Sequence, residues 1–157
     1  MPDLSPTTID LSVEEQARTV VNTRVIDAAI ADVFDAYANP AKIVRWWGPH
    51  GFTLTTQSLD LVEGGHWQFV FHGPDGRDYR NHIVFSKIDP PGLFVVDHVS
   101  GPHYRAIVTF DEVGGRTRVT FHQTFADAVV FAKIREIVNS GNEGNLDRLT
   151  ELLAGQR

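Results

Sequence analysis

The segment from Phe52 to Phe125 restricts the possible folds of this chain more than any other part of the sequence. It alternates short runs of β-branched and aromatic residues with turn-forming residues, as a series of strands does. The turn signals are Glu63-Gly64-Gly65, Gly73-Pro74-Asp75-Gly76, Asp89-Pro90-Pro91-Gly92, Ser100-Gly101-Pro102 and Gly114-Gly115. They predict six strands, and connections this short join antiparallel neighbours rather than crossovers.

Before this segment, the sequence predicts one strand and two short helices. The strand covers residues 17–26 and carries Val21, Thr23 and Val25 on one face. An i, i+3, i+4, i+7 spacing then indicates an amphipathic helix through Ile30, Val33, Phe34 and Tyr37. Asn39 and Pro40 supply the N-cap and the first residue of a second helix, which runs to about Trp47 and ends at Gly48-Pro49.

The end of the chain, residues 127–154, returns to helical spacing. Its predicted buried side comprises Val130, Ile134, Ile137, Val138, Gly141, Leu149, Leu152 and Leu153. Each glycine inside a helix costs about 1 kcal/mol relative to alanine. Gly141 and Gly144 therefore mark either a break in the helix or the close approach of a bulky group, and the sequence alone weighs the two equally.

Together these elements predict an α+β fold, with one strand, two helices, six antiparallel strands and a long C-terminal helix. A curved seven-stranded sheet must then wrap around the long helix. Because a strongly bent sheet and a helix seldom close without a gap, the arrangement predicts a cavity between them.

Composition narrows the class of protein. We expect a single domain at residues 17–154, preceded at 1–16 by a lead-in without the basic and apolar parts of a secretion signal. Fourteen Lys plus Arg against twenty Asp plus Glu give a net charge of -6, which disfavours nucleic-acid binding. The chain has no cysteine and no apolar run long enough to span a membrane. A soluble cytoplasmic protein is expected, and the outward face of the sheet could support a homodimer.

The turn at Gly73-Pro74-Asp75-Gly76 sets the pairing of the strands beside it. Pro-Asp-Gly suits a type I turn followed by a left-handed glycine and a bulge, which pairs Gly73 with Arg77. Counting outward gathers the apolar residues on one face, whereas a two-residue loop would mix the faces. The predicted inner face comprises Trp67, Phe69, Phe71, Tyr79, Asn81, Ile83 and Phe85.

The same alternation assigns inner faces to the later strands. On strand 93–99 the inward residues are Phe94, Val96 and His98, because the opposite choice would bury the Asp97 carboxylate. The last two strands place inward Tyr104, Ala106, Val108 and Phe110, then Val119, Phe121, Gln123 and Phe125. Asn81, His98 and Gln123 are the polar members of this face, and each either bonds within the protein or orients a ligand.

Seven histidines raise the question of a metal site or of acid–base catalysis. His66, His72, His82 and His122 fall on the outward face, and His66 and His72 stand about 20 Å apart along a strand, too far to share an ion. We therefore expect no metal and no cofactor. His98 and His50 are the two that could move a proton near neutral pH; the alternative is that each simply bonds its neighbours.

A set of short motifs is spread between residues 17 and 154. They are Val33-Phe34-Asp35-Ala36, Asn39-Pro40, Arg45-Trp46-Trp47-Gly48-Pro49, Gly51-Phe52-Thr53, Gly64-Gly65, Gly73-Pro74-Asp75-Gly76, Asp97-His98, Gly115-Arg116-Thr117 and Asn145-Leu146-Asp147-Arg148-Leu149. In combination they resemble the family named for activators of the heat-shock-protein-ninety ATPase, a member of the START-like, helix-grip superfamily. Val62-Glu63 departs from the Arg-Pro common in that family, so no role of that arginine carries over.

The resemblance implies a helix-grip fold with a cavity for a hydrophobic or amphipathic small molecule, and it implies no catalytic set. Adjacent helical residues diverge by about 100°, so only one of Trp46 and Trp47 faces the cavity. The predicted lining comprises Trp47, Trp67, Phe69, Phe71, Tyr79, Ile83, Phe85, Tyr104 and Phe121 as walls, with Asn81, His98 and Gln123 orienting the ligand.

Two other functions compete with ligand binding. One is an enzyme of the cyclase, isomerase or hydrolase type that uses His98 or His50 as an acid or base. The other is a co-chaperone, which is not expected, because the eukaryotic activators carry a separate chaperone-binding domain that 157 residues cannot include.

Overall fold

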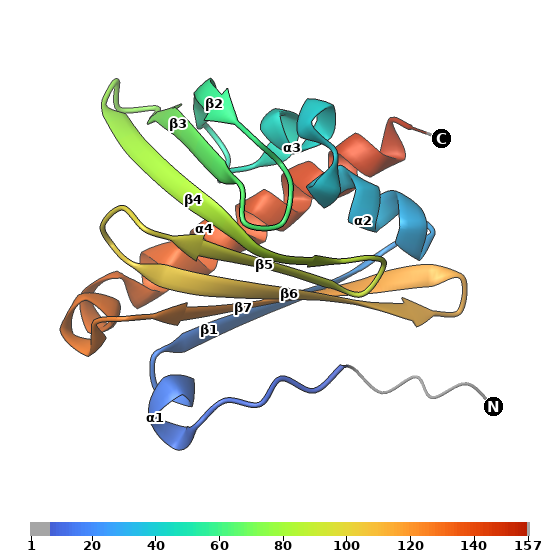
Figure 1. Ribbon diagram of the computed structural model, residues 1–157, viewed down its shortest axis with the longest axis horizontal. Helices are drawn as coiled ribbons and strands as arrows, with labels where there is room; N and C mark the ends of the chain where they lie inside the picture. Colours follow the sequence, from blue (N-terminus) through green and yellow to red (C-terminus); the bar gives the residue numbers. More distant parts are fainter. Residues whose placement is uncertain (1–6, 157) are drawn as a thin grey trace.

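The computed structural model describes residues 7–156, in which one curved sheet wraps around a long helix (Figure 1). The sheet is antiparallel, with the strand order β1-β7-β6-β5-β4-β3-β2. Its strands are β1 (Thr19–Ile26), β2 (Thr53–Leu59), β3 (His66–His72), β4 (Asp78–Asp89), β5 (Leu93–His98), β6 (Tyr104–Val113) and β7 (Arg116–Phe125). The predicted meander from β2 to β7 is confirmed, and β1 extends it by pairing with β7.

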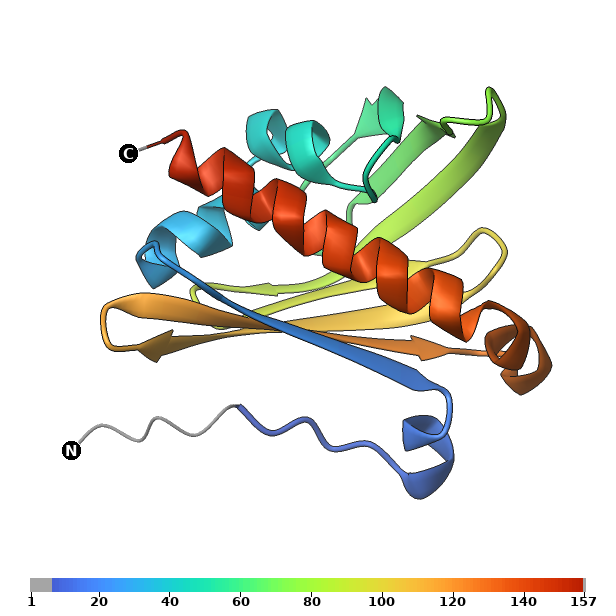
Figure 2. The same cartoon turned by 180° about the vertical axis from the view of Figure 1, so that it is seen from behind.

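Four helices accompany the sheet within the described residues: α1 (Val13–Gln16), α2 (Ile30–Ala38), α3 (Pro40–Trp46) and α4 (Ala128–Ala154). The predicted start of α3 is confirmed, because the Asn39 side chain accepts a hydrogen bond from the Ala41 amide at 3.0 Å and Pro40 is the first helical residue. Asp127 caps α4 in the same way. Figure 2 shows α4 crossing the concave side of the sheet, with α2 and α3 beside its C-terminal half.

The β3–β4 hairpin has the predicted turn and register. The Gly73 amide donates to the Arg77 carbonyl at 2.8 Å, and Gly76 adopts a φ of +82°. The pairs that follow are Phe71 with Tyr79, Phe69 with Asn81 and Trp67 with Ile83. Alternation therefore placed the inner faces correctly, and His98 is buried on its strand as expected.

Aromatic side chains fill much of the space between the sheet and the helices. Trp46 donates from its indole nitrogen to the Ala36 carbonyl at 2.8 Å and packs on Tyr37. On the sheet, Trp67 lies 4.3 Å from Phe69, measured between ring centroids. Residues at most 1% exposed include Trp67, Phe69, Ile83, Phe85, Phe94 and Trp46. The region around these residues, between the sheet and the helices, is a packed core. Any cavity must therefore lie elsewhere along α4.

Helix α4 is continuous through both of its central glycines. A Cβ atom on Gly144 would lie 3.0 Å from Cδ2 and 3.2 Å from the backbone nitrogen of His50, so the close approach of the loop after α3 explains this glycine. The predicted burial of Ile137 is wrong, since that side chain is 73% exposed. Most buried residues of α4 lie in its C-terminal half, beyond Ile137.

Residues 7–18, which precede β1, run along the outward face of the sheet (Figure 1). Residues 1–6 of the expected lead-in lie outside the described residues. The Thr7 amide donates to the Asp111 carboxylate at 3.1 Å, and Ser12 and Glu15 form a reciprocal cap on α1. Between residues 7 and 156, we find no helix with both the length and the apolar character needed to cross a bilayer.

Candidate functional site

A cleft remains between the inner face of the sheet and the middle of α4. Its volume is about 220 Å³. The sheet contributes aromatic walls, the loop after α3 closes one side, and α4 supplies small and polar residues. The lining residues are Trp47, Gly48, Pro49, Phe71, Tyr104, Phe121, Gln123, Ile137, Val138, Gly141, Asn142 and Asn145. We refer to this set as the cleft.

A larger hollow of about 660 Å³ lies on the outward face, between the segment before β1 and strands β4 to β7. Two of its charged groups pair with each other, because the Arg105 guanidinium donates to both oxygens of Asp97 at 2.9 and 3.1 Å. Burial raises the pKa of Asp97, but the hydrogen bonds from Arg105 and Ser86 together with the Arg105 charge outweigh it and hold the pKa below its usual range. With Arg105 and Asp97 paired to each other, this hollow is a weaker candidate for a binding site than the cleft.

The two adjacent tryptophans have different roles. Trp46 is held in the core by its bond to Ala36, whereas Trp47 ends α3 in extended backbone and turns toward the sheet. The ring of Trp47 lies 6.0 Å from Trp67 and 6.5 Å from Phe121. Trp47 is therefore the one that lines the cleft.

Arg148 of α4 fixes the loop that follows Trp47. Its guanidinium donates to the carbonyls of Gly48 at 3.0 Å, of Pro49 and Phe52 at 3.3 Å, and of Arg45 at 3.2 Å. Burial lowers the pKa of Arg148 from its ordinary value. This single side chain gathers four carbonyls and so holds the Arg45-to-Phe52 loop against the helix.

The same loop, from Arg45 to Phe52, requires a glycine at position 48. Its φ is +113°, and a Cβ atom there would lie 2.6 Å from Cε1 of Phe71. Its amide donates to Oδ1 of Asn145 at 3.0 Å. Because a backbone amide can only donate, this bond fixes the orientation of the Asn145 amide. The NH₂ group of Asn145 has no hydrogen-bond partner among the described residues and remains a donor at the cleft.

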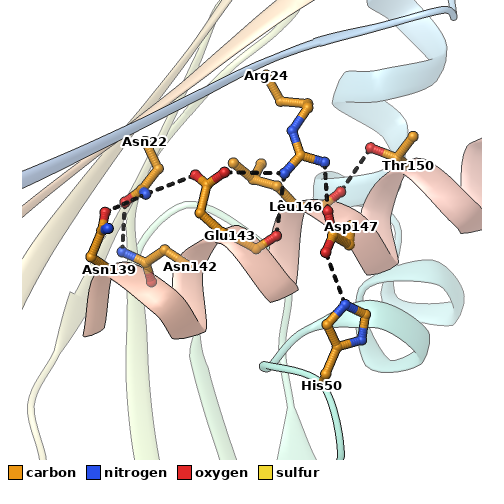
Figure 3. A network of polar contacts seen from close by, with 9 residues as sticks. All are labelled: Asn22, Arg24, His50, Asn139, Asn142, Glu143, Leu146, Asp147 and Thr150. Atoms are coloured by element: carbon orange, nitrogen blue, oxygen red, sulfur yellow. Dashed lines mark hydrogen bonds and ion pairs between the residues drawn. The ribbon is translucent and has the colours of Figure 1, made fainter. Parts of the chain in front are cut away.

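A polar seam joins α4 to β1 (Figure 3). Arg24 donates to Asp147 at 2.8 Å and to the Glu143 carboxylate at 3.3 Å. Asn22, 3% exposed, donates to Asn139 at 2.8 Å and to Glu143 at 2.9 Å. The seam comprises Asn22, Arg24, Asn139, Asn142, Glu143 and Asp147. It satisfies the buried polar groups on β1 and sets the position of the helix across the sheet.

The seam also determines how Gln123 presents its amide. An ionised Glu143 can only accept, so the Asn22 NH₂ faces it and the Asn22 oxygen is left to accept from Asn142 at 3.1 Å. The Asn142 NH₂ therefore also donates to Oε1 of Gln123 at 2.8 Å. Within the part of the chain that the structure describes, the NH₂ of Gln123 has no partner, and it is a second donor at the cleft.

Tyr104 contributes the third free donor. Its ring stacks on His98 with the planes 9° apart and the centroids 4.6 Å apart. Burial raises the pKa of the Tyr104 hydroxyl far above its ordinary value, so the group stays protonated. No residue from 7 to 156 forms a hydrogen bond with that hydroxyl, and Tyr104 lines the cleft.

His98 is bonded within the protein rather than directed into the cleft. Its Nδ1 donates to the Pro102 carbonyl at 2.8 Å, and Nε2 lies 2.6 Å from Asn81 and 3.2 Å from the Ser100 hydroxyl. Burial is the largest influence on its pKa and lowers it from the ordinary value. Both nitrogens are therefore engaged, and the Tyr104 ring stacks against the face of the imidazole.

His50 lies outside the cleft, although its neighbours Gly48 and Pro49 line it. Its Nε2 is 3.0 Å from the Asp147 carboxylate, whose other oxygen accepts from Arg24. These two hydrogen bonds, that of His50 first, hold the pKa of Asp147 below its ordinary range. With its side chain 56% exposed, His50 anchors the loop at the surface of α4.

The structure separates the predicted lining residues into groups. Five of them line the cleft: Trp47, Phe71, Tyr104, Phe121 and Gln123. Trp67, Phe69, Ile83 and Phe85 are in the packed core, and Asn81 bonds His98 and the Tyr79 carbonyl. Tyr79 is 42% exposed near the hairpin tip, where its hydroxyl donates to Asp75.

The polar lining on α4 was not predicted from the sequence. Asn142 and Asn145 follow Val138 at four and seven residues, so they continue the helical stripe that contains Val138 and Gly141. Extending that stripe to polar residues would have found them. No three His, Asp or Glu residues between positions 7 and 156 are placed to hold a metal ion.

Comparisons with known proteins agree with this architecture. The model of the family described as Activator of Hsp90 ATPase homolog 1-like protein matches residues 27–154. A protein from Arthrobacter aurescens superposes with a TM-score of 0.81 at 23% identity, covering 96% of this chain and 93% of that one. A Nitrosomonas europaea protein gives 0.80 at 17% identity, covering 89% and 96%.

The AHSA1 protein from Silicibacter pomeroyi superposes with a TM-score of 0.70 at 21% identity, covering 88% of this chain and 99% of that one. A comparison with curated proteins gave no match. Structural similarity at such low identity establishes the fold and leaves the chemistry to the site itself.

Proposed function

The chain belongs to the family described as Activator of Hsp90 ATPase homolog 1-like protein, and we propose that it binds a small, uncharged, amphipathic molecule in the cleft beneath α4. The observation that carries this proposal is the composition of the cleft. Aromatic rings form its walls, three donors without partners face it, and it contains no ionisable side chain except the tyrosine hydroxyl.

The volume limits the size of the ligand. An apolar cavity of about 150 Å³ can hold benzene. A cleft of about 220 Å³ therefore suits one substituted ring or a short acyl chain. The rings of Trp47, Phe71 and Phe121 offer flat apolar contacts to such a group.

The charge of the lining limits the chemistry of the ligand. No Asp, Glu, Lys, Arg or His is among the lining residues, and the Tyr104 hydroxyl stays protonated. An ionised ligand would lose its hydration without gaining a counter-charge, at a cost of several kcal/mol. The cleft should therefore prefer neutral molecules.

The polar groups of the cleft indicate what the ligand carries. The NH₂ groups of Gln123 and Asn145 are donors, because their oxygens already accept from Asn142 and Gly48. The Tyr104 hydroxyl can donate as well. A carbonyl or ether oxygen on the ligand would satisfy these donors, and an aromatic ketone combines such an oxygen with an apolar ring.

Acetophenone and benzoate form a matched pair for a test, because they have similar size but only benzoate is charged. Titration monitored by ¹H–¹⁵N spectra should shift the side-chain NH₂ resonances of Gln123 and Asn145 with acetophenone, with a dissociation constant of about 1 mM for so small a molecule. Equal concentrations of benzoate should leave both resonances in place.

A blocking variant and a control on the same helix sharpen the test. Gly141→Leu places a side chain in the cleft and should abolish the acetophenone shifts, whereas Ser140→Leu adds the same bulk at an exposed position and should preserve them. Undiminished acetophenone binding by Gly141→Leu would contradict the proposal. Native mass spectrometry of protein purified from its source should then identify the natural ligand.

A further inference from the structure

Two histidines meet on the outward face of the β3–β4 hairpin, on the opposite side of the sheet from the cleft. Nδ1 of His66 lies 2.7 Å from Nε2 of His82, and their rings are 5.0 Å apart at 44°. Register explains the contact, because Gln68 pairs with His82 and so places His66 diagonally across from it. His66 is exposed and His82 partly exposed, so a solute can reach the pair.

We propose that His66 and His82 together bind Cu²⁺ or Ni²⁺, with water in the remaining coordination positions. Without metal, one ring donates its proton to the lone pair of the other. On binding, the donor ring changes tautomer: its proton moves through solvent to its other ring nitrogen, and both facing nitrogens then direct lone pairs at the ion. Imidazole nitrogen is a favourable ligand for these metals, and copper binds most tightly among divalent first-row ions.

The separation of the nitrogens favours these metals over zinc. With metal–nitrogen bonds of about 2.05 Å, two ligands at a right angle are about 2.9 Å apart, whereas tetrahedral ligands are about 3.4 Å apart. The observed 2.7 Å needs only a small opening to occupy adjacent positions of a square-planar or tetragonal site. Zinc would require a much larger displacement of two paired strands.

His72 provides a matched control on the same hairpin. Its Nδ1 is 2.8 Å from the Asp78 carboxylate, and its Nε2 is 2.7 Å from the Thr55 hydroxyl. Both ring nitrogens are engaged, and His72 is too far along β3 to join the pair. Removal of this imidazole should therefore leave the metal site intact.

The test uses tag-free full-length protein titrated with Cu²⁺ at pH 7.5 by calorimetry and electron paramagnetic resonance. The wild-type spectrum should show one tight site with two nitrogen ligands. His66→Gln and His82→Gln should each weaken binding at least tenfold, whereas His72→Gln should match the wild type. Circular dichroism checks that every variant is folded.

Two results would overturn the proposal. One is copper binding of unchanged affinity in both His66→Gln and His82→Gln. The other is an equal loss of affinity in His72→Gln, which would show diffuse binding to surface histidines. Tighter binding of Zn²⁺ than of Cu²⁺ would likewise contradict the right-angle geometry. Because the pair and the cleft are on opposite faces, these outcomes are independent of acetophenone binding.

Discussion

Two glycines on one helix offer a test of how closely the loop after α3 approaches α4. Gly141 and Gly144 are interior residues of the same continuous helix, so replacing either by alanine carries the same intrinsic gain of about 1 kcal/mol. Their surroundings differ. A Cβ atom on Gly141 would be 3.7 Å from Cβ of Pro49, which is an ordinary contact. Gly141→Ala should therefore stabilise the protein by about 1 kcal/mol.

Gly144→Ala should lose that gain. Its Cβ would be 3.0 Å from Cδ2 and 3.2 Å from the backbone nitrogen of His50. The imidazole can rotate, but the backbone cannot retreat, because Arg148 holds the carbonyls of Gly48, Pro49 and Phe52. Overpacking of this kind costs about 1–3 kcal/mol, so the net change is between zero and a loss of about 2 kcal/mol.

Urea denaturation followed by circular dichroism measures both variants under the same conditions. A difference in stability of about 1–3 kcal/mol between them is expected, with unchanged m-values. In thermal unfolding, each kcal/mol should appear as about 2–4 °C for a domain of this size. Equal stabilisation by both alanines would refute the conclusion that the loop requires a glycine at position 144.

Two further predictions concern Arg148 and the buried histidines. Arg148→Met should destabilise the protein by about 3 kcal/mol, because four carbonyls lose a charged donor, and Arg148→Lys should recover only part of this in urea denaturation. Burial lowers the pKa of His98 and His122, so the unfolded chain binds more protons than the folded one. Stability should fall as the pH drops below about 6.5, by at most about 1.4 kcal/mol per pH unit for each histidine. His98→Gln should reduce this slope, and a slope identical to wild type would contradict a lowered pKa for His98.

Turn chemistry and alternation were sufficient to predict the sheet. A left-handed glycine at position 76 fixed the hairpin register, and the pairing of Trp67 with Ile83 followed by counting. Burial then followed from parity, because one face of the sheet must cover the helices packed on it. The order of elements was equally informative, since short turns leave few compact arrangements for an antiparallel meander.

The position of the cleft could not be predicted in this way. Parity states which side chains point inward, but it does not state whether α4 is close enough to fill the space above them. Phe69 and Phe71 share a face, yet Phe69 is packed in the core and Phe71 lines the cleft. Tyr79 has the same parity and lies near the tip of the hairpin, so it is largely exposed.

Polar residues were harder to place than apolar ones, because their partners come from distant parts of the chain. Asn81 on β4 and His98 on β5 bond each other. The second partner of His98 is the Pro102 carbonyl, which comes from a loop. Asn142 donates hydrogen bonds to Gln123, 19 residues earlier in the chain, and to Asn22, 120 residues earlier. No local spacing encodes such contacts, so they emerge only once the helix is positioned on the sheet.

The polarity of the cleft is thus set by a residue that does not line it. Glu143 faces β1, where its carboxylate accepts from Asn22 and Arg24. That acceptor determines the direction of every amide that follows, through Asn142 to Gln123. A neutral side chain at position 143 could donate instead, which would allow the chain of amides to reverse and turn an oxygen of Gln123 toward the ligand. The seam therefore fastens α4 to the edge strand, and under the proposed function it also favours a ligand that accepts hydrogen bonds over one that donates them.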